Sequence, residues 1–372
     1  MTTATRRIPL SSPWIDARDE ELVLEVLRSG RLSLGPTGPR FEQMLAEAVG
    51  APFCAAVSSG TAGLHLCMRL AGVGPGDEVI TSPYSFVASA NCAVYEGAAP
   101  VFADIDPVTF NLDPAAVEAA VTSRTKAIVA VDIFGYPSEL DELRAICDRH
   151  SLALVEDACE ALGASYKGRP LGSHGHPAVF AFYPNKQITT GEGGAVTTGS
   201  EAQFELLVSL RNQGRLETSS WLQHGRFGFN YRLDDLSAAL GIGQLEKLDR
   251  ILAGRRDVAA RYGELLAGFD VEAPLADDRD HVRSWFVYVV KLPAGIDRDG
   301  LVRRLGEQGV DCAPYLPSIH LQSYMRERFG FREGLCPVSE DCSARTMAIP
   351  FHARLEPEDQ ERVVEAIRVC LH

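Results

Sequence analysis

From about residue 53 the chain alternates short apolar runs with stretches that have helical spacing. The apolar runs are FCAAVS, DEVITS, APVFADI, KAIVAVDI and LALVED, and the helical stretches between them include Leu140 to His150. This alternation predicts βαβ units that build a mostly parallel sheet with helices on both faces. The chain is therefore expected to be an α/β protein.

Two helices are predicted before this alternation, and a long helical pattern follows it. Apolar residues have helical spacing from Asp16 to Ser29, and a second helix covers Arg40 to Val49. A further amphipathic pattern begins near Leu236 and continues far beyond the usual length of a helix. Three glycines in it are expected to bend or divide the helix: Gly241, Gly243 and Gly254.

The C-terminal part of the chain has the pattern of a smaller unit. Ser284 to Leu292 is a predicted strand, and Arg298 to Gln308 is a predicted helix. A chain of 372 residues is too long for one small core and suits a large domain joined to a smaller one. We predict a large domain over residues 1–250, with the N-terminal helices, and a smaller α+β domain over residues 251–372.

Charge and composition argue against several classes of function. The formal net charge is −14, so a nucleic-acid backbone is not an expected partner. No apolar stretch reaches the about 18 residues of a membrane span, and the first residues lack the apolar core of a secretion signal. The nine cysteines show no CxxC pairing, which predicts reduced thiols in a cytoplasmic protein. His174 and His176 form an isolated HxH, and no metal site is predicted.

One lysine stands apart from the other charged residues. Lys186 follows the apolar run Val179–Phe182 and precedes a Gly-rich turn, Gly191–Gly194, after which a second apolar run begins. This pattern places an amine on a short connection between two buried strands. Such an amine is partly desolvated, which suits a lysine that forms a Schiff base with a carbonyl. A surface lysine whose apolar stem covers a strand gives the same local pattern, so the surrounding segments must decide.

A possible phosphate cup follows the first predicted strand. Ligands of open parallel sheets bind at the carboxyl ends of the strands, and this strand passes into Ser58-Ser59-Gly60-Thr61 and then a helix. Gly60 allows close approach of an anion, Thr61 supplies a hydroxyl, and the helix N-terminus supplies unpaired N–H groups. A plain N-cap would have the same residues.

Two further strand ends carry residues that suit a cofactor. Asp157 follows the strand LALVE, where a carboxylate can keep the pyridine nitrogen of pyridoxal phosphate protonated. Phe86 follows the strand DEVITS, where an aromatic ring can stack on a cofactor ring. The alternatives are a helix-capping aspartate and a core phenylalanine. A pyridoxal phosphate enzyme with an aspartate-aminotransferase-like large domain explains the cup, the aromatic residue, the carboxylate and the lysine together.

The chain resembles the DegT-type (StrS-like) sugar aminotransferases, which use pyridoxal phosphate to make amino sugars on nucleotide carriers. The similarity extends from SGRLSLGPTGPRFE to AIPFHARLEPEDQERVVEAI, nearly the whole length. Its most specific phrases are SSGTAGLHL, GPGDEVITSPYSFVASAN, VEDACEALGASYKG, FYPNKQITTGEGG and FNYRLDDLSAALGIGQLEKLD. The resemblance implies the type I pyridoxal phosphate fold, with a smaller C-terminal α+β domain.

The resemblance also implies roles for the residues that bind the cofactor. Lys186 would form the Schiff base and would carry a proton between C4′ of the cofactor and the substrate carbon. Asp157 would pair with the pyridinium nitrogen, and Phe86 would stack on the ring. Gly60 and Thr61 would bind the phosphate.

Further residues are implied at the subunit boundary and in the substrate pocket. Asn230 would reach the phosphate of the neighbouring subunit, so the resemblance implies a homodimer with shared active sites. Arg232 would help to shape the site. Tyr315 and His320 resemble residues that line the sugar-nucleotide pocket.

Three positions distinguish this chain within the family. Many members have Gln where this chain has Glu160; a glutamate beside the phenolic oxygen of the cofactor requires one of the two groups to be protonated. Many have Ser where this chain has Ala181, which removes one hydroxyl from the phosphate site. Relatives that remove a sugar hydroxyl have His at the lysine position, so Lys186 favours amine transfer.

The resemblance therefore predicts transfer of an amino group from L-glutamate to a nucleotide-linked keto sugar, with pyridoxamine phosphate as the intermediate form of the cofactor. TTGEGG favours a 4-keto-6-deoxy sugar. A 3-keto sugar and a keto-inositol acceptor, which would give an aminocyclitol, remain alternatives. Two other classes also remain: a lyase or racemase that acts on an amino acid, and a regulator without catalysis.

Overall fold

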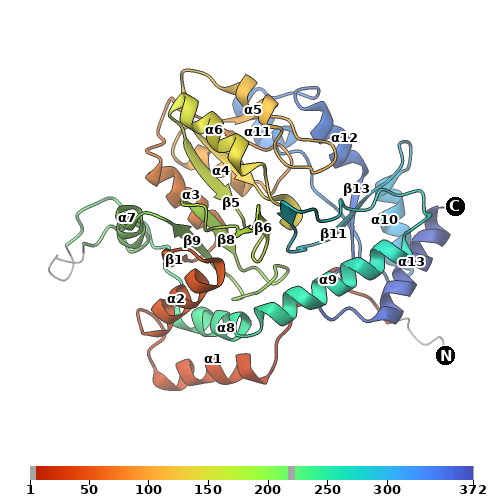
Figure 1. Cartoon of the computed structure of the whole chain (residues 1–372), viewed down its shortest axis with the longest axis horizontal. Helices are drawn as coiled ribbons and strands as arrows, with labels where there is room; N and C mark the ends of the chain where they lie inside the picture. Colours follow the sequence, from red (N-terminus) through yellow and green to blue (C-terminus); the bar gives the residue numbers. More distant parts are fainter. Residues whose placement is uncertain (1–5, 217–222, 372) are drawn as a thin grey trace.

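The computed structural model describes residues 6–216 and 223–371. Its central sheet has the strand order β1-β9-β8-β5-β4-β2-β3 (Figure 1). Only β9 among these strands runs antiparallel to its neighbours, so the prediction of a mostly parallel sheet is confirmed. The strands are β1 (Phe53–Val57), β2 (Glu78–Thr81), β3 (Ala99–Phe102), β4 (Thr125–Val131), β5 (Ala153–Asp157), β8 (Ala178–Ala181) and β9 (Gly194–Thr198).

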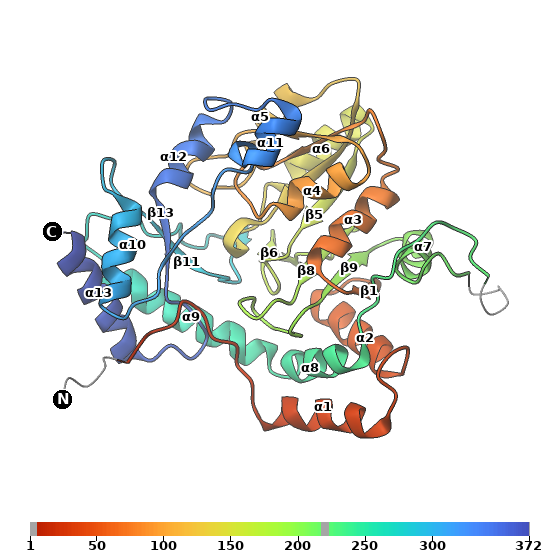
Figure 2. The same cartoon turned by 180° about the vertical axis from the view of Figure 1, so that it is seen from behind.

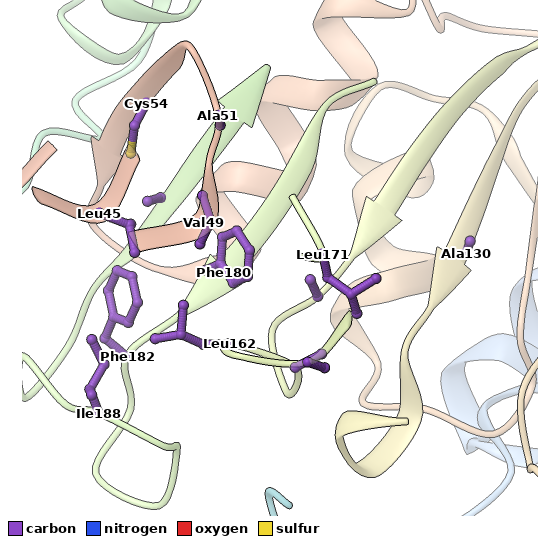
Figure 3. Packing of buried hydrophobic residues seen from close by; sticks show 14 of the residues in the cluster. Leu45, Val49, Ala51, Cys54, Ala130, Leu162, Leu171, Phe180, Phe182 and Ile188 are labelled. Carbon is purple, nitrogen blue, oxygen red and sulfur yellow. The ribbon is translucent and has the colours of Figure 1, made fainter. Parts of the chain in front are cut away.

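Alternate side chains of each central strand pack on opposite faces of the sheet, as a strand period of two requires. Cys54 and Ala56 belong to one buried cluster, and Ala55 and Val57 belong to the other. The first cluster is covered by α1 (Ala17–Ser29), α2 (Thr37–Val49), α5 (Pro114–Ala120), α6 (Leu140–His150) and α8 (Asp235–Leu245). The second is covered by α3 (Gly60–Leu70), α4 (Ala88–Tyr95) and α7 (Glu201–Arg211). Figure 3 shows part of the first cluster, with Phe180 of β8 and Val49 of α2.

A smaller antiparallel sheet, in the order β11-β13-β12, forms a separate core. Its strands are β11 (Tyr288–Lys291), β12 (Ala313–Pro314) and β13 (Thr346–Ile349), and α10 (Arg298–Glu307) and α13 (Pro357–Leu371) pack with them. The shorter elements are β6 (Ser165–Tyr166), β7 (Arg169–Pro170), β10 (His281–Val282), α11 (Ser323–Phe329) and α12 (Pro337–Arg345), with 3₁₀ turns at Ile133–Gly135 and Ile319–Leu321.

Helix α9 (Leu248–Leu265) connects the two cores, and Figures 1 and 2 show α8 and α9 running along one side of the molecule. Ile251 lies in the core of the large sheet, whereas Val258 and Tyr262 lie in the smaller core. Ile8, near the N-terminus, also packs in the smaller core. The domain boundary at residue 250 stays a prediction. No helix in the described part of the chain is long and apolar enough to cross a membrane.

The prediction that glycines divide the long helical pattern is wrong. The break between α8 and α9 lies at Glu246 and Lys247, and the three glycines lie inside the helices. A Cβ added to Gly241 would meet Cε2 of Phe41 at 2.5 Å, and one added to Gly254 would overlap the carbonyl oxygen of Ala353. These glycines therefore permit close packing of helices instead of breaking them.

Candidate active site

A cavity of about 580 Å³ lies at the carboxyl ends of the parallel strands β1, β2, β4, β5 and β8. Seven of the predicted site residues line it: Gly60, Thr61, Phe86, Asp157, Glu160, Lys186 and Tyr315. These residues are far apart in the sequence, and the parallel topology brings them together at one edge of the sheet. Asn230, Arg232 and His320 do not line this cavity.

Lys186 lies on the connection between β8 and β9, as the apolar pattern predicts. Its Nζ is 3.3 Å from Oε1 of Glu160 and 3.9 Å from the centre of the Phe286 ring. Only 13% of the side chain is exposed. Both neighbours attract an ammonium group, one through its carboxylate and the other through the electron-rich face of its ring.

The chain contains only five lysines, so few amines are available to a cofactor. Lys186 is the one that lines the cavity. Three of the others form ion pairs elsewhere: Lys167 with Asp141, Lys247 with Asp16 and Asp19, and Lys291 with Asp341. Lys126 is exposed on β4. A lysine-bound cofactor in this cavity therefore requires Lys186.

Asp157 ends β5 and is 5% exposed. Its Oδ2 accepts a hydrogen bond from Oγ of Ser89 at 2.7 Å, and its Oδ1 accepts one from the amide of Cys159 at 3.3 Å. The described residues that directly follow Asp157 form turns and not a helix, so the alternative of a helix cap is wrong. A buried carboxylate on the cavity wall suits a cationic ring nitrogen.

The phosphate cup combines a helix cap with an open helix end. Oγ of Ser59 accepts a hydrogen bond from the amide of Ala62, and Gly60 and Thr61 are the first residues of α3. Amides of the first helical turn have no partner inside the helix and bind anions well. A Cβ on Gly60 would lie 2.8 Å from both Cβ of Ala181 and Sγ of Cys159. Glycine thus lets α3 begin directly against the ends of the sheet.

Two aromatic residues stand at the cavity with much of their surface exposed. Phe86 is 61% exposed on the loop between β2 and α4, so the alternative of a core residue is wrong. Tyr183 is 52% exposed and also lines the cavity. Sequence reasoning missed Tyr183 and Asn185, whose Oδ1 is buried without a hydrogen-bond partner. Their position beside Lys186 in FYPNK was the available signal.

Glu160 uses both carboxylate oxygens. Oε1 faces Lys186, and Oε2 accepts a hydrogen bond of 2.9 Å from the amide of Phe134. Tyr315, from the C-terminal part, packs near the ring of Phe134, and burial raises the pKa of its phenol. Ala181 lines the cavity beside Gly60, so the cavity wall has a methyl group and no hydroxyl at this position.

The three remaining predicted residues lie elsewhere. His320 is fully buried, and its Nε2 is 2.9 Å from Oε1 of Glu340, so it does not reach the cavity. Arg232 donates hydrogen bonds to Asn212 and Gln213, at 2.9 and 2.8 Å. Asn230 is exposed. The segment 230–232 nevertheless lies beside the cup, because the carbonyl of residue 231 accepts a hydrogen bond from the amide of residue 58.

The HxH pair belongs to a buried polar cluster. Nε2 of His176 is 2.8 Å from Oε2 of Glu156, and Arg144 contacts Nδ1 of the same ring at 3.1 Å. Burial lowers the pKa of His176 to about 3 and raises the pKa of Glu156 to about 8. Within the described ranges, no three His, Cys, Asp or Glu side chains gather in a way that could hold a metal ion.

Comparison with known proteins identifies the family of this chain. The family model described as the DegT/DnrJ/EryC1/StrS aminotransferase family matches residues 13–368. This chain belongs to that family. The family resemblance seen in the sequence is therefore confirmed, and the chain is a pyridoxal phosphate-dependent transaminase with the type I fold.

Individual relatives match over almost the whole chain. The GDP-perosamine synthase of Caulobacter vibrioides is 37% identical over 97% of this chain and 97% of its own. The structure of DesV from S. venezuelae is 34% identical, covers 98% of both chains and has a TM-score of 0.91. The PLP-form of Spr1654 from Streptococcus pneumoniae is 26% identical, also covers 98% of both chains and has a TM-score of 0.94.

The residues around the cavity fit this cofactor. The buried carboxylate suits its ring nitrogen, and the helix N-terminus with open amides suits its phosphate. The exposed aromatic ring suits the face of its ring, and the cavity's lysine suits its aldehyde. When bound, pyridoxal phosphate supplies an electron sink that stabilises negative charge on the carbon beside the reacting amine.

Proposed function

We propose that this transaminase moves an amino group from L-glutamate to a nucleotide-linked keto sugar, for the biosynthesis of a polysaccharide, glycan or antibiotic. The observation that carries the proposal is that Lys186 and Asp157 line the same cavity. The family resemblance implies histidine at the lysine position in relatives that remove a sugar hydroxyl, so the lysine supports amine transfer. The relative named GDP-perosamine synthase supports a sugar acceptor on a nucleotide carrier.

Five residues on the cavity wall have tasks in this proposal. Asp157 accepts a hydrogen bond from the ring nitrogen, because its buried carboxylate favours a positively charged partner. The amides of Gly60 and Thr61 hold the phosphate, and Phe86 covers the ring. Nζ of Lys186 holds the cofactor and then acts as the base and acid that moves a proton at the substrate carbon.

The acceptor proposed here is a 4-keto-6-deoxy sugar, on the evidence of the phrase TTGEGG that follows Lys186. Tyr315 is the proposed contact with the substrate from the C-terminal part, because it lines the cavity. A panel of nucleotide-linked 4-keto sugars, 3-keto sugars and keto-inositols, incubated with glutamate, tests the choice. We expect 2-oxoglutarate and a C-4 amine with the 4-keto sugar.

Three other results would contradict parts of this proposal. Amination at C-3, or of a keto-inositol, would replace the proposed acceptor. Turnover of an amino acid without any keto acceptor would indicate a lyase or racemase. Purified protein that lacks the absorption band of lysine-bound pyridoxal phosphate, even after the cofactor is added and the unbound excess is removed, would contradict the enzymatic function and favour a regulator.

The proposed working unit is a homodimer in which Asn230 of one subunit contacts the phosphate site of the other. Asn230 is exposed, and its segment lies beside the cup of its own chain. An exposed polar residue at this place is available to a second copy.

We also propose that the protein works in the cytoplasm, in line with nine cysteines that are all free thiols.

A further inference from the structure

Helix α9 buries an arginine directly behind the cavity lysine. The side chain of Arg255 is buried, and the residue as a whole is 3% exposed. Its Nη2 donates a hydrogen bond of 2.9 Å to the carbonyl oxygen of Lys186. Its Nη1 donates to the carbonyl oxygens of Trp285, at 3.2 Å, and Phe286, at 3.0 Å. One guanidinium group therefore joins three segments of the chain.

Charge pairing does not account for this arginine. No carboxylate of the described residues forms an ion pair with Arg255, and its Nε has no hydrogen-bond partner. Burial lowers the pKa of the guanidinium to about 10. A buried, unpaired charge is unfavourable for folding, so its retention needs another reason. The contacts that remain are the three carbonyl groups and the ring of Phe351.

The carbonyl groups belong to residues that shape the surroundings of Lys186. The ring of Phe286 is the one that contacts Nζ of Lys186, at 3.9 Å. Trp285 has a φ of 50°, a left-handed conformation that is rare for a bulky residue and needs support from its neighbours. Gln187, next to Lys186, donates a hydrogen bond to Oγ of Ser284 at 2.8 Å. The segment 284–286 thus contacts the amine of Lys186 through Phe286 and the side chain of the neighbouring Gln187 through Ser284.

Arg255 lies at the point where α9 passes from one core to the other. Ile251 and Leu252 pack in the core of the large sheet, and Val258 and Tyr262 pack in the smaller core. A residue between these two sets contacts elements of both units. Arg255 therefore connects the lysine of the large sheet with the strand β11 that begins two residues after Phe286.

We propose that Arg255 is a positioning residue that holds the main chain of Lys186 and the ring of Phe286 in one geometry, so that Nζ points into the cavity. The inference rests on the proposed role of Lys186 as cofactor anchor. Arginine is suited to this task because its planar fork reaches several acceptors at once, whereas a lysine ammonium reaches fewer with less defined geometry.

Binding of two forms of the cofactor distinguishes a role of Arg255 in positioning Lys186 from a general role in the stability of the fold. Pyridoxal phosphate bonds to Nζ of Lys186 through its aldehyde carbon, with loss of one water, whereas pyridoxamine phosphate has an amine there and binds without that bond. In Arg255→Met, we expect the affinity for pyridoxal phosphate to fall about tenfold or more, and that for pyridoxamine phosphate to stay within about threefold. Arg255→Lys should show a smaller loss.

Arg256→Met is the matched control, because Arg256 is the exposed next residue of the same helix. It should bind both forms as the wild type does. Equal loss of both forms in Arg255→Met, or no loss of either, would overturn the proposal. If Arg255→Met does not fold, Arg255→Lys decides: wild-type affinity for pyridoxal phosphate in that variant would also overturn it.

Lys186→Ala distinguishes failure of this inference from failure of the proposed function. If Lys186 anchors the cofactor, this variant loses the tight binding of pyridoxal phosphate and keeps that of pyridoxamine phosphate. Wild-type binding of both forms by Lys186→Ala would remove the proposed anchor itself. A selective loss in Lys186→Ala together with unchanged binding in Arg255→Met would remove only the role of Arg255.

Discussion

At the scale of single residues, Glu160 is the charged neighbour of the cavity lysine. Its Oε1 is 3.3 Å from Nζ of Lys186, and the amide of Phe134 orients its other oxygen. A carboxylate at this distance forms an ion pair with the amine, and this pair must open before the amine bonds to the aldehyde of the cofactor. A glutamine at this position would carry no negative charge and would accept hydrogen bonds through one oxygen only.

Glu160→Gln should therefore bind pyridoxal phosphate more tightly at a fixed pH. We expect the affinity to rise about threefold, because attachment of the cofactor no longer has to break the ion pair between Lys186 and the carboxylate. The absorption of the lysine-bound cofactor, titrated against the concentration of pyridoxal phosphate, measures it. Glu192→Gln, a change at an exposed carboxylate on the same cavity wall, is the control. Equal affinities in both variants and the wild type would show that the ion pair has no effect.

His352 is a partly buried histidine whose pKa is lowered mainly by burial. Burial, with smaller contributions from Arg255 and Arg354, lowers the pKa of His352 to about 4. In the unfolded chain this histidine binds a proton near pH 6.5. Its contribution to the free energy of unfolding is therefore complete above that pH and decreases as the pH falls from 6.5 towards 4.

His352→Gln should therefore lose less stability than the wild type between pH 7 and pH 4.5. Because the side chain is partly exposed, we expect a difference of about 1 kcal/mol after allowance for solvent screening. Urea unfolding at the two pH values measures it. The same acid dependence in both proteins would contradict the depressed pKa.

At the scale of elements, close helix packing depends on glycines that helix propensity alone disfavours. Gly241 in α8 lies against Phe41 of α2, where a Cβ would be 2.5 Å from Cε2 of the ring. Gly263 in α9 has the same helical environment, but a Cβ added there would have no atom of another residue within 4 Å. The two glycines thus have the same helical backbone conformation but differ in the room available for a side chain.

Alanine at these positions should change stability in opposite directions. Gly241→Ala is expected to destabilise the protein by about 1–3 kcal/mol, because the added methyl group overpacks the contact. Gly263→Ala should stabilise it by about 0.5–1 kcal/mol, because alanine restricts the unfolded chain. The free energy of unfolding in urea measures both. Stabilisation by Gly241→Ala would contradict the packing role.

At the scale of the whole molecule, the sequence predicts what depends on local patterns. The alternation of apolar runs and helices leads to the parallel sheet, and residues at strand ends, such as Asp157 and Lys186, must then meet at one edge. Arg255 and Phe286 could not be predicted in the same way. They reach Lys186 from 69 and 100 positions further along the chain, through contacts that leave no periodic signal.

For His320 the sequence suggests a contact with the substrate pocket that the packing of the chain does not provide. The sequence resemblance places it in the substrate pocket, but its ring is buried against Glu340 and Phe102. A histidine in a loop has the same appearance in the sequence whether it faces a cavity or the protein interior. Only the packing of the surrounding segments decides between the two.

The proposed shared active site can be tested by mixing two inactive variants. Lys186→Ala and Asn230→Ala should each be inactive or weak alone, while a mixed dimer contains one site with both native residues. Random exchange of subunits should restore about a quarter of the wild-type activity. Glutamate-dependent 2-oxoglutarate formation after denaturation and refolding of the mixture measures it. No recovery in mixtures shown to contain mixed dimers would contradict the contribution of Asn230 to the neighbouring site.

The central claim is that Lys186 holds the cofactor, and one measurement tests it directly. The protein is loaded with pyridoxal phosphate, reduced with borohydride and digested, and the labelled peptide is identified by mass spectrometry. We expect the label on the peptide that contains Lys186 and on no other. A label on another lysine, or none while the protein transfers amino groups, would contradict the account; the other lysines are Lys126, Lys167, Lys247 and Lys291.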